Sequence, residues 1–254
     1  MKILNYGSLN IDHVYQMPAF VKAGETLSAT DCQLHTGGKG LNQSVALARA
    51  GAEVFHGGKI GADGLELKAF LEEAGADCRF LRIDPEIPTG HAIIQVVASG
   101  ENCILIYGGT NTRITEAEID ETLENFGPGD LLLLQNEISN VNYLIHRANE
   151  KGMITVLNPS PITAELLTYD GLSLLDWMIV NQGEAEALAG LYGHLRGYIE
   201  DFNSEAVGSM IRALDHYSFP GREQERFNEL KRAYEAMDWV AMMSIFDENG
   251  EENG

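Results

Sequence analysis

Strand-like and helix-like runs alternate from the first residues to about residue 190, and this alternation constrains the fold more than any other feature. "KILNYGS" is followed by "LNQSVALARA", "EVFHGGKIG" by "LELKAFLEEAG", and "DLLLLQ" by "VNYLIHRANEKG". A repeated strand-then-helix order predicts parallel strands joined by right-handed crossovers. We therefore expect an α/β domain around a parallel sheet. In "GADG", which opens the second of these helices, Asp63 is the expected N-cap.

Two stretches depart from this rhythm and read as extended chain without helices. They are "DHVYQMPAFVKAGETLSATDCQLH", at about residues 12–35, and "TGHAIIQVVASGENCILIY", at about 89–107. The second contains "ASGEN", which is typical of a hairpin turn. We expect the two stretches to form a small antiparallel β lid over the main sheet. Such strands leave an apolar surface exposed, which predicts a possible homodimer through the lid.

The last quarter of the chain has a different pattern of apolar residues. After residue 190 apolar residues recur at helical spacing, as at Leu195, Ile199 and Phe202, and no strand signal follows. Ser204 and Asp238 are the expected N-caps. We therefore expect one α/β domain over residues 1–190 and an all-helical tail of unassigned role over 191–254.

Composition excludes several classes of partner and site. The formal net charge of −21 argues against nucleic acid, because binding phosphates needs clustered lysine and arginine. The longest apolar run, Leu131–Leu134, is too short to cross a bilayer, and the N-terminus shows no signal-peptide pattern, so we expect a cytoplasmic protein without a membrane partner. The three cysteines are widely separated and the histidines lack metal-binding spacing, so neither a disulfide framework nor a zinc site is expected.

A glycine-rich turn, "GGKGLNQS" at residues 37–44, opens the first predicted helix. Glycines let backbone N–H groups approach a ligand closely, the helix dipole favours negative charge there, and Lys39 adds a mobile cation. The turn lacks the spacing of a P-loop, however, and a purely structural tight turn explains it equally well when it is taken alone.

The order of the polar motifs favours a functional interpretation. "GSLNIDHV" at residues 7–14, "GGKGLNQSVALARAGA", "PTG", "LLLQNEIS", "LNPSP" and "VNQGEAEAL" follow one another along the chain. This arrangement closely resembles the ribokinase-like, or PfkB-type, carbohydrate kinase family over residues 1 to about 190. The resemblance implies a three-layer α/β fold and a transferase that phosphorylates a ribose-like sugar with ATP.

The resemblance also implies site residues. Asn10 and Asp12 match the family's ligands for sugar hydroxyls, and an amide and a carboxylate suit that task. Further positions that match the sugar pocket are Gly37, Gly38, Lys39, Asn42 and Glu137. Asn181 and Glu184 match the family's N-x-x-E element, which organises Mg²⁺ and phosphate, so the implied cofactors are ATP and Mg²⁺, the latter held indirectly by Glu184 through water.

Each of these residues also has a simpler interpretation when it is taken singly. Asp12 could cap a turn, Glu137 could cap the helix that follows it, and Glu184 could be an ordinary surface carboxylate. Their common order along the chain favours the sugar pocket over these alternatives.

The chain departs from the family in its last quarter. Family members carry a second signature, D-T-x-G-A-G-D, whose last Asp is the base for the sugar hydroxyl and whose glycines open a helix that forms an anion hole. The 254 residues do not contain this signature or the segments that hold the nucleotide, so no catalytic residue is assigned and we expect impaired or absent activity in this truncated form. The alternatives are a non-catalytic sugar-binding module and an interaction protein that acts through the helical tail.

The tail has a weaker resemblance of its own. Its short acidic helices resemble the C-terminal helices of some hybrid sensor histidine kinases. A phosphotransfer role would need an exposed histidine, for which His194 and His216 are the candidates, but a histidine packed on a helix surface is the simpler interpretation.

Overall fold

A computed structural model describes residues 1–185, 207–208, 211 and 222–247. The chain divides into two compact units, Met1–Leu157 and Asn158–Gly254. The domain boundary expected near residue 190, the two candidate tail histidines and the expected N-cap Ser204 lie outside the described residues. The boundary therefore stays a prediction.

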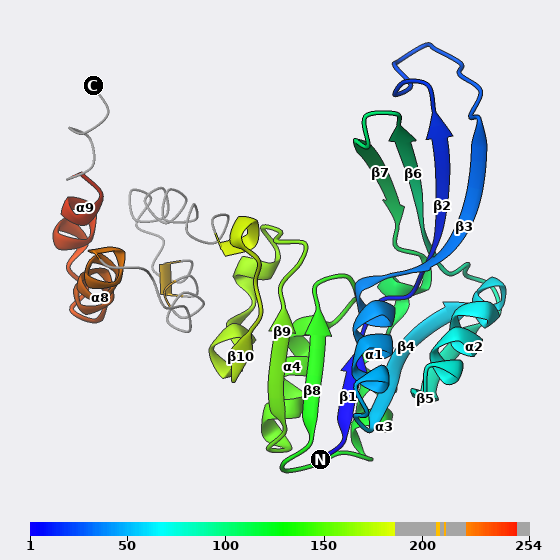
Figure 1. Ribbon diagram of the computed structural model, residues 1–254. Coiled ribbons are helices and arrows are strands. Elements are labelled where there is room, and N and C mark those ends of the chain that lie inside the picture. Colours follow the sequence, from blue (N-terminus) through cyan, green and yellow to red (C-terminus); the bar gives the residue numbers. More distant parts are fainter. Residues whose placement is uncertain (186–206, 209–210, 212–221, 248–254) are drawn as a thin grey trace. The chain divides into compact units, whose positions relative to one another are not determined.

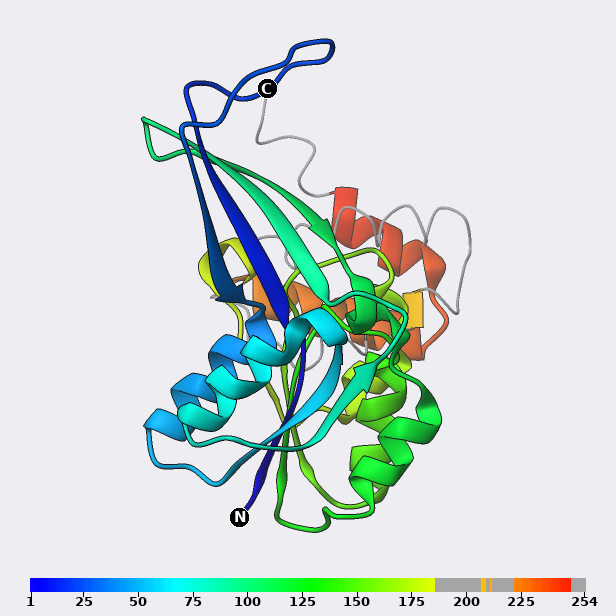
Figure 2. The ribbon, with the colours of Figure 1, turned by 90° about the vertical axis from the view of Figure 1, so that its right-hand side faces the viewer.

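The first unit is built around a parallel sheet with helices on both faces (Figures 1 and 2). Five of its strands follow the order β9-β8-β1-β4-β5, and the pairs β1–β4, β1–β8 and β4–β5 are parallel. These strands are β1 (Ile3–Tyr6), β4 (Val54–Gly61), β5 (Asp77–Asp84), β8 (Leu131–Gln135) and β9 (Ile154–Asn158).

The helices complete a three-layer α/β arrangement, which confirms the predicted fold class. Figure 2 shows α1 and α2 on one side of the sheet and α3 and α4 on the other. The helices are α1 (Lys39–Arg49), α2 (Leu65–Glu73), α3 (Glu116–Leu123) and α4 (Val141–Glu150), and short 3-10 turns cover Ala62–Gly64 and Gly109–Arg113.

The core explains why these segments take these forms. Every residue of β1 and β4 is buried, as expected for strands covered on both faces. In α4 the buried residues fall at positions i, i+3, i+4 and i+7, which is one stripe of an amphipathic helix: Val141, Leu144, Ile145 and Ala148.

A second, four-stranded sheet forms the predicted lid, and it projects from the carboxyl ends of the main strands (Figure 1). Its order is β3-β2-β6-β7, and the turn at Gly100 (φ 85°) closes the β6–β7 hairpin. The central pair, β2–β6, is parallel rather than antiparallel, because both strands leave the main domain from the same end. The strands are β2 (Asn10–Met17), β3 (Asp31–Gly37), β6 (Gly90–Val97) and β7 (Asn102–Tyr107).

The prediction that Asp63 caps the second helix is wrong. The residue before α2 is Gly64, and it makes no side-chain cap. Asp63 Oδ1 instead accepts hydrogen bonds from Thr89 N (2.9 Å) and Thr89 Oγ1 (2.7 Å), at the root of lid strand β6. The two donors of Thr89 hold the carboxylate, so this residue anchors the lid to the main domain.

The described parts of the second unit contain a short strand, two 3-10 turns and helices. Phe227, Leu230 and Met242 are buried in a cluster shared by α8 and α9. Asp238 Oδ1 accepts a hydrogen bond from Ala241 N (2.9 Å), which confirms Asp238 as the N-cap of α9. The elements are the 3-10 turns Leu166–Thr168 and Asp170–Leu174, β10 (Trp177–Met178), α8 (Arg222–Glu235) and α9 (Trp239–Asp247).

A buried polar network joins β1, α1, β4 and β8 beneath the start of α1. Asn5 Nδ2 donates to Gly40 O (2.7 Å) and Ser44 Oγ (2.8 Å), and Gln135 Nε2 donates to Asn5 Oδ1 (2.9 Å). Ser44 Oγ lies 2.7 Å from Nδ1 of His56. Burial lowers the pKa of His56 from 6.5 to about 4, so the imidazole is neutral near pH 7.

This histidine should make folding sensitive to mild acid. Because the pKa of His56 is lowered on folding, its neutral form supports stability above pH 6.5, and that support is lost as the pH falls toward about 4. Between pH 7 and pH 5 we expect the wild type to lose roughly 2 kcal/mol of unfolding free energy through this group. Urea denaturation of the wild type and of His56→Gln at both pH values measures it.

The exposed His35 provides the matched control. His35→Gln should keep the wild-type difference between the two pH values, whereas His56→Gln should show a difference smaller by that amount. Equal differences in all three proteins would contradict the assignment to His56.

Candidate functional site

The first turn of α1 has partners for its backbone donors. Lys39 N donates to Glu137 Oε2 (3.2 Å), Gly40 N to Ser8 Oγ (3.3 Å) and Leu41 N to Ser8 O (3.0 Å). These groups would otherwise be orphan donors of a helix N-terminus. The helix dipole favours negative charge at this glycine turn, and in the structure the chain's own Glu137 supplies it.

Glu137 is held at this helix terminus by three groups. Its Oε1 forms an ion pair with Lys39 Nζ at 2.9 Å, and its Oε2 accepts hydrogen bonds from Lys39 N and from Ser8 Oγ (2.5 Å). The Glu137 side chain is 14% exposed and that of Lys39 is 38% exposed. The alternative in which Glu137 caps the following helix is wrong, because the residue before α4 is Asn140 in a left-handed conformation (φ 61°).

Two glycines of the turn are required by close approaches. Gly38 has φ 98°, which disfavours residues with a side chain, and a Cβ there would lie 2.7 Å from Ser8 O. A Cβ on Gly37 would lie 2.1 Å from Oδ2 of Asp12. The carboxylate of Asp12 therefore lies over the backbone of Gly37, which pairs with Asn10 across the lid.

Asp12 lies within β2, so the alternative that it caps a turn is wrong. Partial burial raises the pKa of its carboxyl, the negative charge of Glu137 raises it further, and His35 and His13 oppose the shift. Within the described part of the chain this carboxylate has no hydrogen-bond donor. Its oxygens are therefore acceptors that a ligand hydroxyl can use.

Asn10 and Asp12 lie two residues apart on β2, and so they face the same side of the lid. The pairing register places Ala92 opposite Asp12, and Ile106 opposite Ala92, on that same side. The polar pair is thus bordered by apolar side chains. Asn42 lies in the first turn of α1, where it is exposed and its backbone N–H donates to Gly38 O (3.1 Å).

Two residues that the motifs did not single out contribute to this cluster. Ser8 joins Glu137 to the start of α1, and Asn111 donates through Nδ2 to Oδ1 of Asn10 (2.8 Å). Ser8 is completely buried and Asn111 is 2% exposed. Asn111 stands in "GGTNTR", whose letters indicate only a turn, so the sequence carried no signal of this contact.

Asn181 and Glu184 belong to the second unit, and they cap one another. Glu184 N donates to Asn181 Oδ1 (2.8 Å), and Asn181 N donates to Glu184 Oε2 (3.0 Å). The same oxygen lies 3.5 Å from Asn158 Nδ2. Glu184 is therefore more than an ordinary surface carboxylate, because it closes the helical turn that begins at Gln182.

These three residues suit an indirect metal site better than a direct one. Residues 1–185, 207–208, 211 and 222–247 contain no group of three His, Cys, Asp or Glu side chains placed to hold a metal ion. Mg²⁺ commonly keeps several waters and takes only one or two carboxylates. One carboxylate beside two amides fits water-mediated binding, as the resemblance implies.

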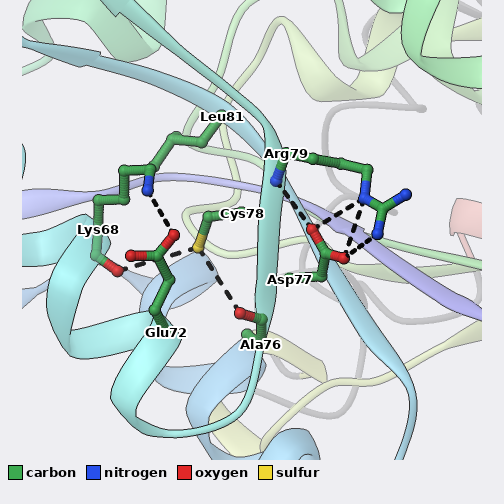
Figure 3. Close-up of a pocket in the computed structure, with 7 residues that line it drawn as sticks. All are labelled: Lys68, Glu72, Ala76, Asp77, Cys78, Arg79 and Leu81. Carbon is green, nitrogen blue, oxygen red and sulfur yellow. Dashed lines mark hydrogen bonds and ion pairs between the residues drawn. The ribbon is translucent and has the colours of Figure 1, made fainter.

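A separate hollow beside α2 and β5 offers little chemistry (Figure 3). Lys68 pairs with Glu72, and Arg79 Nε lies 2.9 Å from Asp77 Oδ2, on the other side of β5. Burial raises the pKa of Cys78 to about 12, so its thiol is not a nucleophile near pH 7. The charges drawn in Figure 3 neutralise one another in pairs, which disfavours this hollow as a catalytic site.

Among the helices that the structure describes, none combines the length and the apolar character needed to span a bilayer. The cytoplasmic location expected from the sequence stays a prediction.

Comparison with known proteins gives consistent matches over most of the chain. The family described as "pfkB family carbohydrate kinase" matches residues 1–209 of this chain. A ribokinase from Haemophilus influenzae is 39% identical over 189 residues, which cover 73% of this chain and 61% of that protein. The chain spans roughly three-fifths of the length of the curated relatives it matches.

Solved structures agree with this match. A ribokinase from Cryptococcus neoformans var. grubii in complex with ADP has a TM-score of 0.66 and 34% identity, covering 85% of this chain and 68% of that one. A ribokinase from Arabidopsis thaliana complexed with ribose and ATP has a TM-score of 0.62 and 28% identity, covering 76% of this chain and 62% of that one.

Proposed function

Because the chain belongs to the pfkB family of carbohydrate kinases, we propose that its first unit binds a ribose-like sugar at the cluster formed by Asn10, Asp12 and the first turn of α1. The observation that carries this proposal is the Asp12 carboxylate, which is partly buried and has no hydrogen-bond donor in the described part of the chain. An acceptor without a donor of its own, at the base of a lid strand, suits the hydroxyls of a sugar.

Each residue has a distinct task in this proposal. Asp12 accepts hydrogen bonds from sugar hydroxyls, and Asn10 supplies an amide beside it. Lys39 and Glu137, held together as an ion pair, offer a hydrogen-bond donor and an acceptor at the N-terminus of α1. Gly37 and Gly38 keep the backbone close enough for these side chains to meet, and Asn42 borders the same turn.

ATP and Mg²⁺ are the cofactors that we propose for the family reaction. Mg²⁺ would neutralise charge on the transferred phosphoryl group. Asn181 and Glu184 would hold it through water, together with Asn158, while the capping contacts keep the Glu184 carboxylate in place. The relatives with bound ADP or ATP support a nucleotide for the complete family member.

We also propose that this chain by itself transfers phosphate poorly or not at all. The D-T-x-G-A-G-D signature, with its basic Asp and its anion hole, is absent from the 254 residues. Loss of a general base costs about 10²–10⁴ in rate, and loss of anion-hole donors costs about another 10²–10³. The second candidate function, a sugar-binding module without catalysis, is favoured by the intact cluster around Asp12.

The first prediction in this group concerns sugar binding. Isothermal titration with ribose should give a measurable affinity for the wild type, and Asp12→Asn should weaken it by at least about tenfold, because an amide replaces an acceptor that sugar hydroxyls use. Asp31→Asn is the matched control, since Asp31 is an exposed carboxylate at the far end of the lid. Equal affinities in all three proteins would remove Asp12 from the site.

A second prediction concerns catalysis. Purified chain incubated with ATP, Mg²⁺ and ribose should release ADP at a rate at least about 10² below that of a complete ribokinase measured in parallel. Rapid ribose-dependent release that Asn181→Ala and Glu184→Ala abolish, and that the exposed Glu66→Ala leaves intact, would show that the missing signature is not needed.

The lid is the proposed surface for homodimer formation. Large apolar side chains stand exposed on both of its faces, among them Leu34 (64%), Ile104 (51%) and Leu105 (66%). Contiguous exposed apolar surface on a sheet favours association with a second copy.

This proposal predicts the mass of the particle in solution. Analytical ultracentrifugation should show a dimer of the 27.8 kDa chain at micromolar concentration. The double variant Ile104→Lys/Leu105→Lys places a charge on each face and should be monomeric, whereas Leu65→Lys, at an exposed leucine of α2, should stay dimeric. A monomeric wild type would contradict the proposal.

A further inference from the structure

The side-chain amide of Asn111 is held by three hydrogen bonds. Its Oδ1 accepts a hydrogen bond from Leu9 N (3.1 Å), and its Nδ2 donates to Leu9 O (3.1 Å) and to Asn10 Oδ1 (2.8 Å). Both N–H bonds of the amide and its carbonyl oxygen are therefore used. With 2% of its surface exposed, Asn111 has no water to replace these partners.

The backbone of Leu9 fixes which way the Asn111 amide points. A backbone N–H can only donate and a backbone C=O can only accept, so a flipped Asn111 would set donor against donor and acceptor against acceptor. Such mismatched buried groups cost free energy. The end of Asn111 that reaches Asn10 is consequently its NH₂ group, and that group requires an oxygen opposite it.

We propose that Asn111 is a positioning residue that fixes the amide of Asn10 so that its NH₂ group, and not its oxygen, is presented to the ligand. Asn10 Oδ1 is taken by Asn111, and Asn10 Nδ2 has no hydrogen-bond partner in the described part of the chain. Beside Asp12, an acceptor, the site then offers one fixed donor. The donor and the acceptor suit neighbouring sugar hydroxyls, so this inference rests on the proposed function.

Gly90, at the start of lid strand β6, makes room for the pair. A Cβ on Gly90 would lie 2.3 Å from Asn111 Nδ2 and 2.4 Å from Asn10 Oδ1, so the hydrogen bond between the two amides passes over this glycine. Asn111 O also accepts from Ser139 N (3.0 Å), two residues beyond Glu137. Asn111 thus joins the root of the lid to the loop that carries the acidic side of the site.

The orientation can be tested without a sugar. In protein labelled with ¹⁵N at asparagine, the side-chain NH₂ of Asn111 should exchange with solvent at least about tenfold more slowly than that of Asn10, because within the described part of the chain the first donates two hydrogen bonds and the second donates none. Asn111→Asp replaces the donor by an acceptor, so Asn10 should turn its NH₂ inward and become protected. An Asn10 NH₂ group that is already protected in the wild type would overturn the proposal.

Ribose titration then tests the consequence for binding. Asn111→Asp should weaken ribose by at least about tenfold, because Asn10 now presents oxygen beside Asp12. Asn125→Asp, at an exposed amide at the end of α3, adds the same charge and should bind like the wild type. Unchanged affinity in Asn111→Asp, with wild-type binding intact, would overturn the positioning role.

Two further outcomes are distinguishable. If the wild type shows the expected exchange pattern but takes up no ribose, the orientation stands and the proposed function fails. If Asn111→Asp does not fold, Gly90→Ala gives the test, because its methyl group separates the two amides without adding charge. In that variant the protection of the Asn111 NH₂ should fall toward that of Asn10, and retention of full protection would overturn the proposal.

Discussion

The placement of Glu137 at the N-terminus of α1 is the interaction on which the candidate site depends. This carboxylate receives the first backbone N–H of the helix, the hydroxyl of Ser8 and the ammonium group of Lys39, so it joins the segment after β1, the start of α1 and the loop after β8 in one contact. Negative charge at a helix N-terminus is stabilising because the helix dipole places partial positive charge there. The same negative charge contributes to the raised pKa of Asp12, and so the geometry of the turn also sets the electrostatics of the lid side of the cluster.

The sequence predicted the layers of the fold well because they depend on local patterns. The alternation of strand-like and helix-like runs gave the parallel sheet, and the two extended stretches gave the lid strands β2, β3, β6 and β7. The contacts that hold the site were harder to predict because they join distant positions. Ser8 and Glu137 are 129 residues apart, and Leu9 and Asn111 are 102 apart. No periodicity reports such a pair. The capping role predicted for Asp63 is wrong for the same reason, since the donors that its carboxylate accepts from lie on Thr89.

The two units place different chemistry in different parts of the chain. The acceptor and donor groups suited to a sugar lie within residues 1–157, whereas the N-x-x-E element that would organise Mg²⁺ lies in the second unit as a reciprocal helix cap. Such a cap explains why the motif would persist as a folded turn even without phosphate chemistry. Phosphoryl transfer depends on positioning and charge stabilisation. Under the proposed function, binding a sugar therefore requires only groups of the first unit, whereas phosphate transfer also requires groups outside it.

The pairing of the lid strands has a mechanical consequence. β2 and β6 pair without interruption from Asn10 and Gly90 to Met17 and Val97, which makes the four strands one stiff plate. Each of its four attachments contains glycine: Gly7 before β2, Gly37–Gly38 at the end of β3, Gly90 at the start of β6 and Gly108–Gly109 after β7. Any rigid-body rotation of the lid would therefore be concentrated in the backbone torsions of these few glycine-containing segments. Asn10 lies at the base of the lid, next to these hinge segments, and Asp12 is only two residues further along β2. A rotation that moved the tip of the lid near Gly100 by a large distance would therefore displace these two polar side chains much less.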